Sequence, residues 1–309
     1  MQKDELKGHA SMLGANLMWG AMSPVAKLLM IGGTVSPLVV TDLRIGGAMV
    51  LFWLASFFLP AEHVAPKDML KLFVASLLAI VFNQGSFIFG VGMTSPVDAS
   101  IITTSMPLWA MLLAALYLKE PITGKKVLGI AAGASGALLL ILGSGQNTVV
   151  HEGDNHILGD FLILAAQFSY ACYIVFFKNF VTKYSLVTIM KWMFTYAFIC
   201  ALPFSYHSLS TTAWTTLNFQ EIMGILFVVV CGTFLSYVFV VVGQKSLRPT
   251  VAGMYNYLQP VVATSIAILW GLDTFNVMKV ISVLLIISGV YLVTTSKSRR
   301  DMQSIPEEK

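Results

Sequence analysis

The feature that most constrains this chain is an internal repeat, because its two halves carry matching residues at a constant separation of 153 positions. The matches lie in long apolar stretches of a chain that is 57% hydrophobic and only 11% charged. Soluble domains carry about 25% charged residues, so a soluble fold could not cover this much apolar surface. We therefore expect two similar bundles in a membrane. The matched pairs are Pro96 and Pro249, Ala99 and Ala252, Pro107 and Pro260, Ala110 and Ala263, Lys126 and Lys279, Val127 and Val280, Ser135 and Ser288, and Gly136 and Gly289.

Apolar windows of about 20 residues predict membrane-spanning helices. Such windows occur near 11–31, 37–59, 69–91, 97–118, 126–143, 158–177, 186–206, 222–243, 250–270 and 277–296. The predicted fold class is an all-α integral membrane protein with about ten transmembrane helices in two five-helix repeats. The predicted domains are an N-terminal tail (1–10), a first repeat (11–143), a linker (144–157), a second repeat (158–296) and a C-terminal tail (297–309).

The basic residues predict the orientation. They gather at both termini and in alternate connections, whereas the connections near 32–36, 92–96, 144–157, 207–220 and 271–276 contain no Lys or Arg. By the positive-inside rule both termini are cytoplasmic and the linker is external, in a bacterial inner (plasma) membrane. A net charge of +4 in this arrangement favours a lipid bilayer over nucleic acid as the partner. An odd number of helices per repeat makes the two repeats inverted.

The sequence argues against a metal site, a cofactor and an enzyme. The three cysteines, Cys172, Cys200 and Cys231, lie in apolar stretches without C-x-x-C spacing. Four potential ligands in the linker are interpreted as a solvated loop. No G-x-x-x-x-G-K-[ST] motif for ATP is present, and no intramembrane nucleophile has an evident base. The linker residues are His151, Glu152, Asp154 and His156.

Polar stripes on the fourth and ninth helices predict a substrate site. Positions i, i+3, i+4 and i+7 lie on one face of a helix, and unsatisfied polar groups are costly in hydrocarbon. We expect both stripes to face a shared cavity for a small-molecule substrate. The alternative is that the hydroxyl groups bond to their own helix and the prolines only shape packing. The stripes are Ser100, Thr103, Thr104 and Pro107, and Gly253, Asn256, Tyr257 and Pro260.

Aromatic and amide side chains on four further helices are predicted to complete the lining of this cavity. An aromatic and polar lining suits a small amphipathic solute. The alternative is that each residue joins two helices without meeting a substrate. These candidates are Asn16 and Trp19 on the first helix, Gln167 and Tyr170 on the sixth, Asn83 and Gln84 on the third, and Tyr237 on the eighth.

Arg44 is the charge that most suggests a function, because it lies inside its predicted helix. A charge within the membrane is a functional hypothesis by default, and we predict that Arg44 contacts an anion. The alternatives are pairing with Asp42 or Asp98, or extension to the membrane surface. Acidic residues are sparse at the predicted membrane centre. A neutral or zwitterionic, amino-acid-like substrate is therefore favoured over cationic drugs exchanged for protons.

Two further patterns concern helix shape and packing. Pro107 and Pro260 lie near the middle of their predicted helices, and each removes a backbone donor. We predict that they are the hinges of the two halves. Gly129 and Gly133 have the spacing of a close helix contact. The contact is expected within the chain, so a monomer is favoured over a homodimer.

Taken in tandem order, these residues resemble a known family. The signature consists of the Gly14-Ala-Asn-Leu-Met-Trp-Gly20 stretch, the proline-centred fourth helix, its exit Leu118-Lys119-Glu120 and the Gly/Ala-rich segment 129–142. It resembles the drug/metabolite transporter superfamily, EamA type. The resemblance implies alternating access and export of small organic metabolites. The second unit departs from the pattern, since Asp273 replaces Glu120 and Tyr170-Ala171 replaces Trp-Gly. The other interpretations are a non-catalytic membrane scaffold or a membrane enzyme of unrecognised type.

Overall fold

The computed structural model describes residues 3–31, 35–93, 102–142, 156–269 and 277–296, and all regular structure within them is helical. The elements of the first half are α1 (Lys3–Ile31), α2 (Pro37–Phe57), α3 (Pro66–Ser76), η1 (Leu77–Val81), α4 (Phe82–Met93), α6 (Met106–Tyr117) and α7 (Gly124–Leu142). Those of the second half are α8 (His156–Phe176), η2 (Phe180–Thr182), α9 (Leu186–Thr211), η3 (Trp214–Thr216), α10 (Phe219–Val229), η4 (Val230–Leu235), α11 (Ser236–Ser246), α12 (Pro249–Met254), η5 (Tyr255–Tyr257), α13 (Leu258–Leu269) and α14 (Val277–Thr294). The prediction of an all-α protein is confirmed.

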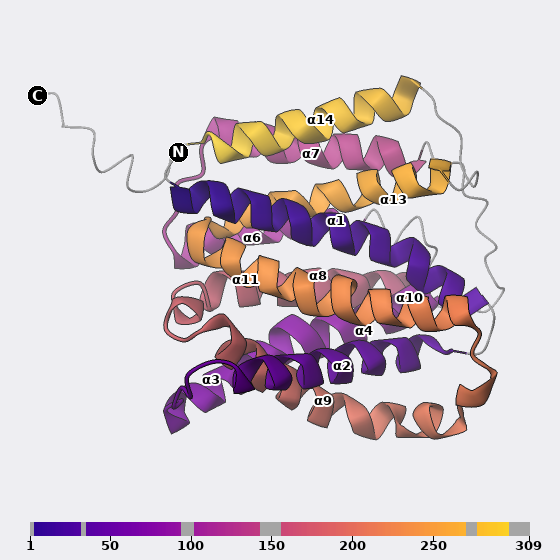
Figure 1. The fold of residues 1–309 in the computed structure, drawn as a ribbon. Helices are drawn as coiled ribbons and strands as arrows, with labels where there is room; N and C mark the ends of the chain where they lie inside the picture. Colours follow the sequence, from indigo (N-terminus) through magenta and orange to yellow (C-terminus); the bar gives the residue numbers. More distant parts are fainter. Residues whose placement is uncertain (1–2, 32–34, 94–101, 143–155, 270–276, 297–309) are drawn as a thin grey trace, which may run out of the picture.

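The helices lie side by side in a bundle, with the start of α1 and the end of α14 at the same end (Figure 1). Within the described residues, six helical segments are long and apolar enough to cross a membrane. They are Leu38–Phe57, Pro66–Phe87, Ile157–Phe176, Leu186–Thr211, Phe219–Ser246 and Val277–Thr294.

Local sequence signals set where several helices begin. Ser36 caps α2, since its hydroxyl accepts the Val39 N–H at 3.3 Å, and Pro37 follows at the first turn. Ser185 caps α9 in the same way. Asn218 and Glu221 form a capping box at α10, in which each side chain accepts the other's backbone N–H. These caps satisfy N–H groups that a helix leaves unpaired at its start.

Helix packing follows the same pattern in both halves. α4 packs on α8, as its counterpart α11 packs on α1. α6 packs on α8 as α13 packs on α1, while α2 packs on α9 and α7 on α14. In Figure 1, α7 lies beside α14 and α1 lies beside α13.

Glycine allows α7 and α14 to approach closely. A Cβ atom placed on Gly289 would lie 2.5 Å from the Gly129 carbonyl oxygen and 2.7 Å from the Gly133 nitrogen. Real Cβ atoms do not come this near to backbone atoms, so only glycine fits at this position. The glycine face of α7 is thus covered by a helix of the same chain.

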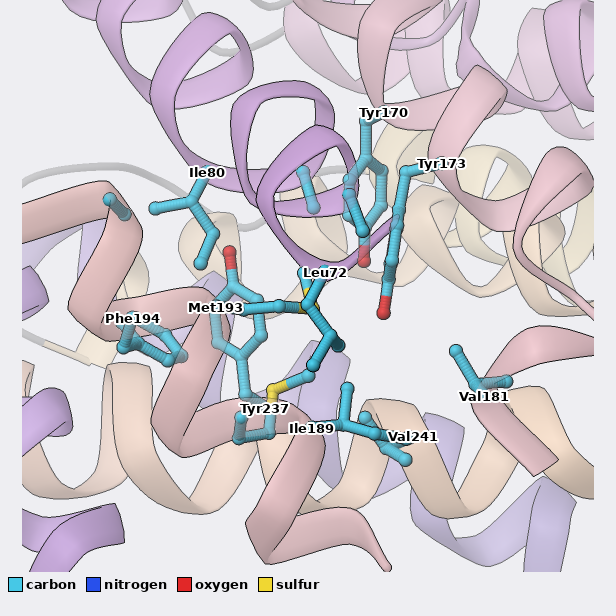
Figure 2. Close-up of a cluster of buried hydrophobic side chains, with 14 of the residues drawn as sticks. Leu72, Ile80, Tyr170, Tyr173, Val181, Ile189, Met193, Phe194, Tyr237 and Val241 are labelled. Atoms are coloured by element: carbon cyan, nitrogen blue, oxygen red, sulfur yellow. The ribbon is translucent and has the colours of Figure 1, made fainter. Parts of the chain in front are cut away.

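The largest apolar cluster lies between α3, α8, α9 and α11 (Figure 2). Leu72, Ile189 and Met193 are fully buried in it, and the rings of Tyr170, Tyr173 and Tyr237 border it. Phe194 packs edge-on against Tyr237, with the ring centroids 5.0 Å apart. This core joins elements of both halves and fixes the positions of the tyrosines.

Two long helices contain π-helical turns that the sequence analysis did not predict. η1 interrupts the α3–α4 helix, and η4 interrupts the α10–α11 helix. η4 begins 153 residues after η1, which is the separation of the sequence repeat. π-Helical turns are rare and often occur at functional sites.

The helices expected to continue past the two prolines are interrupted just before them. The prediction of one continuous helix near 250–270 is wrong, because the 3₁₀ turn η5 separates α12 from α13 and Pro260 follows it. In the first half α6 begins at Met106, after a turn at Thr104 and Ser105, and Pro107 lies in its first turn. Proline fits the first turn of a helix because it has no N–H to leave unpaired.

Candidate functional site

Three aromatic rings from three helices meet at the centre of the candidate site. The ring centroid of Trp19 (α1) lies 6.3 Å from that of Tyr170 (α8) and 5.9 Å from that of Tyr237 (α11), in edge-to-face geometry. The Trp19 Nε1–H donates to the Gly232 carbonyl of η4 at 3.1 Å. We call Trp19, Tyr170 and Tyr237 the aromatic centre.

Gln84 connects the aromatic centre to the first half of the chain. Its Nε2 donates to the Tyr237 hydroxyl at 3.1 Å, and the two residues are 153 positions apart. Positions that correspond in the repeat therefore touch each other.

Two polar atoms at the aromatic centre are buried without a partner. Gln84 Oε1 and the Tyr170 hydroxyl form no hydrogen bond within the described part of the chain. Both side chains are 6% exposed. A buried polar group without a partner costs about 1–3 kcal/mol, so such groups are rare unless water or a ligand satisfies them. Figure 2 shows the Tyr170 ring beside that of Tyr173, whose hydroxyl donates to Gln244 Oε1 at 3.2 Å.

A second polar group links α1 to the segment formed by η5 and α13. Gln259 Nε2 donates to Asn16 Oδ1 at 2.9 Å and to Asn256 Oδ1 at 3.2 Å. Asn16 is fully buried, and its Nδ2 donates to the Met12 carbonyl at 2.8 Å. We call Asn16, Asn256 and Gln259 the amide group. Asn16 lies one turn before Trp19 on α1, so the two groups adjoin along that helix.

Arg44 contacts the π-helical turn that also holds Trp19. Its Nε donates to Thr233 Oγ1 at 3.1 Å, and Thr233 Oγ1 donates to the Val228 carbonyl at 2.9 Å. Among the described residues, no carboxylate lies within ion-pair distance of Arg44. The alternative of pairing with Asp42 is therefore wrong, since the two side chains form no ion pair. Asp98 lies outside the described residues.

The structure separates some of the predicted site residues. The Tyr257 ring packs against Gly133 of α7, where a glycine Cβ would lie 2.6 Å from it, and it belongs to an apolar cluster with Met254 and Ile130. Asn83 Nδ2 donates to the Ala166 carbonyl at 3.0 Å and so joins α4 to α8. Gln167 is buried on α8, and Thr103 and Thr104 are half-buried beside α6. Ser100 lies outside the described residues.

The sequence model of the EamA-like transporter family matches residues 6–142 and 157–295. The chain belongs to this family. The predicted resemblance is confirmed, and the family is one of membrane transporters rather than enzymes.

Two relatives illustrate the breadth of the family. The "Uncharacterized transporter YetK" of Bacillus subtilis is 22% identical over 99% of this chain and 92% of its own length. The "Probable amino-acid metabolite efflux pump" of Escherichia coli is 27% identical over 89% of this chain and 91% of its own length. A solved crystal structure superimposes with a TM-score of 0.77 at 16% identity, covering 95% of this chain and 97% of the other. That likeness shows that the two chains share a fold.

The structure adds two residues to this EamA-like site that sequence reasoning missed. Gln259 joins the amide group, and Thr233 accepts a hydrogen bond from Arg44. Gln259 precedes Pro260 inside an apolar stretch, so an amide in that setting was an available signal. Thr233 gave none, because a lone threonine in an apolar helix commonly bonds to its own backbone.

Proposed function

We propose that this EamA-like transporter is a secondary transporter or facilitator that exports small, amino-acid-like metabolites across the inner membrane by alternating access. Its substrate would bind between the aromatic centre and the amide group. The single observation that carries this proposal is the pair of unsatisfied polar atoms, Gln84 Oε1 and the Tyr170 hydroxyl, at a point where α1, α4, α8 and α11 meet. A substrate that entered between these helices would supply the missing partners.

The packing supports an arrangement of ten spans in two inverted five-helix repeats, 11–143 and 158–296. If each element is replaced by its counterpart in the other half, the contact of α4 with α8 becomes the contact of α11 with α1. The contact of α6 with α8 likewise becomes the contact of α13 with α1. The contact between Gln84 and Tyr237, which correspond in the repeat, fits a pseudo-two-fold axis through the site. A monomer is favoured because α14 covers the glycine face of α7.

The names of relatives support the substrate class and the direction. Proteins from Escherichia coli and Salmonella typhimurium are each named a probable amino-acid metabolite efflux pump. The absence of Lys and Arg from alternate connections supports cytoplasmic termini. Uncoupled facilitation and coupling to an ion are both compatible with the site.

The test compares metabolites inside and outside cells that produce the wild type, Trp19→Ala or Asn256→Ala at equal abundance in the membrane. We expect amino-acid-like compounds to accumulate outside with the wild type, and this accumulation to fall severalfold with either variant. Trp214→Ala is the matched control, because Trp214 lies in the exposed turn η3. Profiles that do not differ between cells with and without the protein would favour a scaffold, whereas normal export by both variants would move the site elsewhere.

A further inference from the structure

Arg44 is a cation in the interior that the described chain neither pairs nor fully covers. Its Nε donates to Thr233, which uses one of the five N–H donors of a guanidinium group. The side chain keeps some accessible surface, and no carboxylate of the described residues lies within ion-pair distance. Within the described chain the two Nη nitrogens, with four donors in a planar fork, form no hydrogen bond.

Arg44 belongs to the same site as the aromatic centre. It lies near enough to Tyr237 for the guanidinium charge to act on the phenol. Its anchor, Thr233, directly follows Gly232, whose carbonyl accepts the Trp19 indole N–H. The π-helical turn η4 therefore accepts hydrogen bonds from both the Arg44 guanidinium and the Trp19 indole, and Tyr237 follows it on α11.

The nearby charges do not neutralise Arg44. Asp42, two residues earlier on α2, forms no ion pair with Arg44, and its Oδ2 has no partner in the described chain. Lys191, which corresponds to Arg44 in the repeat, places its Nζ over the Trp53 ring at 4.8 Å from the centroid. Thr233 and Tyr237 thus offer Arg44 hydroxyl groups, and among the described residues no acid lies within ion-pair distance of it.

We propose that Arg44 binds the carboxylate of the transported substrate, and that the substrate class is carboxylates with an aromatic or other apolar side chain. This rests on the proposed function, since it assumes that the aromatic centre lies on the transport route. A guanidinium fork matches a carboxylate in bidentate geometry, and Trp19 and Tyr170 supply aromatic surface for the apolar part. The carboxylate, and not an amino group, is then the feature recognised. An α-amino group is dispensable because, among the described residues, no acid pairs with Arg44 or with the aromatic centre.

The test measures flux in proteoliposomes with three probes that share one ring. L-Phenylalanine carries both an amino and a carboxylate group, 3-phenylpropanoate carries only the carboxylate, and phenethylamine carries only the amine. We expect the wild type to move the first two and not the third. Arg44→Gln should lower flux of both carboxylates about 10- to 100-fold, in line with the loss of a charge-assisted bidentate pair. Arg44→Lys should retain part of the carboxylate flux, because the positive charge is kept.

Lys191→Gln is the matched control, because it removes the corresponding cation of the other half and should leave flux unchanged. Thr233→Val keeps the shape of its side chain but removes the acceptor of Arg44 Nε. If Thr233 is a positioning residue, this variant raises KM for the carboxylates severalfold with little change in maximal rate. Unchanged KM for both carboxylates would contradict that role.

The outcomes separate this inference from the proposed function. Transport of phenethylamine as fast as phenylpropanoate, or normal carboxylate flux in Arg44→Gln, overturns the role of Arg44 and leaves the transporter intact. Failure of the wild type to move any of the three probes counts against the proposed substrate class itself, and with it against the inference. A loss in Arg44→Gln with normal thermal stability supports the inference.

Discussion

At the scale of single residues, hydrogen-bond satisfaction distinguishes structural polar groups from candidate functional ones. Asn83 is satisfied by a backbone carbonyl of α8 and so joins two helices. Gln84 and Tyr170 each keep a buried atom without a partner in the described chain. Helical spacing in the sequence predicts which residues share a face, but not which neighbour that face meets. For this reason Tyr257 could be assigned to the polar stripe and yet lie against α7.

Glu62, in the connection between α2 and α3, makes a pH-dependent contribution to stability. Its carboxylate accepts the Ser185 N–H at 3.0 and 3.2 Å. Burial acts to raise the pKa of Glu62, but hydrogen bonds with Thr188 and Ser185 outweigh it and hold the pKa below its ordinary value. A carboxyl group with a lowered pKa stabilises the fold above its unfolded pKa, and this stabilisation is lost as the pH falls through the folded pKa.

Glu62→Gln should therefore lower the thermal unfolding midpoint slightly at pH 7, and the difference from the wild type should vanish as the pH falls below about 4. Thermal unfolding in detergent across this range is the measurement. Asp4→Asn, at an exposed position on α1, is the control. A difference that stays constant with pH would show that the charge of Glu62 does not contribute.

At the scale of elements, helix ends and helix breaks differ in how far the sequence predicts them. A serine cap and a first-turn proline mark where α2 begins, a serine cap marks where α9 begins, and the predicted starts agree with both. The π-helical turns could not be predicted from the sequence. An apolar run such as Leu77–Val81 shows no pattern that distinguishes a π-helical turn from an α-helical one. The break before Pro260 follows from the missing N–H of proline, but the 3₁₀ form of η5 depends on tertiary packing.

Pro107 and Pro260 remain the predicted hinges of the two halves, now placed directly after a break in each helix. Pro107→Ala or Pro260→Ala restores a backbone donor and should stabilise one facing state. We expect slower turnover with substrate binding retained. Flux and binding are measured in parallel, with Pro203→Ala inside α9 as the control. Normal flux in both variants would assign the prolines to packing alone.

The contact between α7 and α14 is predicted to tolerate no side chain at Gly289. Gly289→Ala places a Cβ against backbone atoms of α7 and should cost about 1–3 kcal/mol as the helices move apart. Gly85→Ala on α4 is the control, because nothing lies within 4 Å of a Cβ at that position. Thermal unfolding of the two variants is the comparison. Equal midpoints would show that the helices separate without loss.

At the scale of the whole molecule, the repeat and the apolar runs were sufficient to predict the all-helical class, and the motifs in tandem order indicated the family. They could not predict which helices of one half contact which of the other. The contacts of α4 with α8 and of α11 with α1 depend on shape at the interface, which a single sequence does not reveal. The amide group, which joins Asn16 to Gln259 across 243 positions, is a product of that packing.

The orientation is tested by single-cysteine labelling after replacement of Cys172, Cys200 and Cys231. Lys125→Cys should be protected from an impermeant reagent added outside, and Asn155→Cys should react with it. The physical reason is the retention of positive charge on the cytoplasmic side. Labelling at position 125 without labelling at 155 would reverse the assignment.

The central claim is that the polar groups of both halves line one route that opens to each side in turn. The most direct measurement is the reactivity of Thr104→Cys and Asn256→Cys with impermeant thiol reagents, applied from each side of oriented vesicles with and without substrate. We predict that each position reacts from one side at a time, and that substrate shifts the balance between the two sides. Both positions being unreactive from either side, with or without substrate, would contradict the claim.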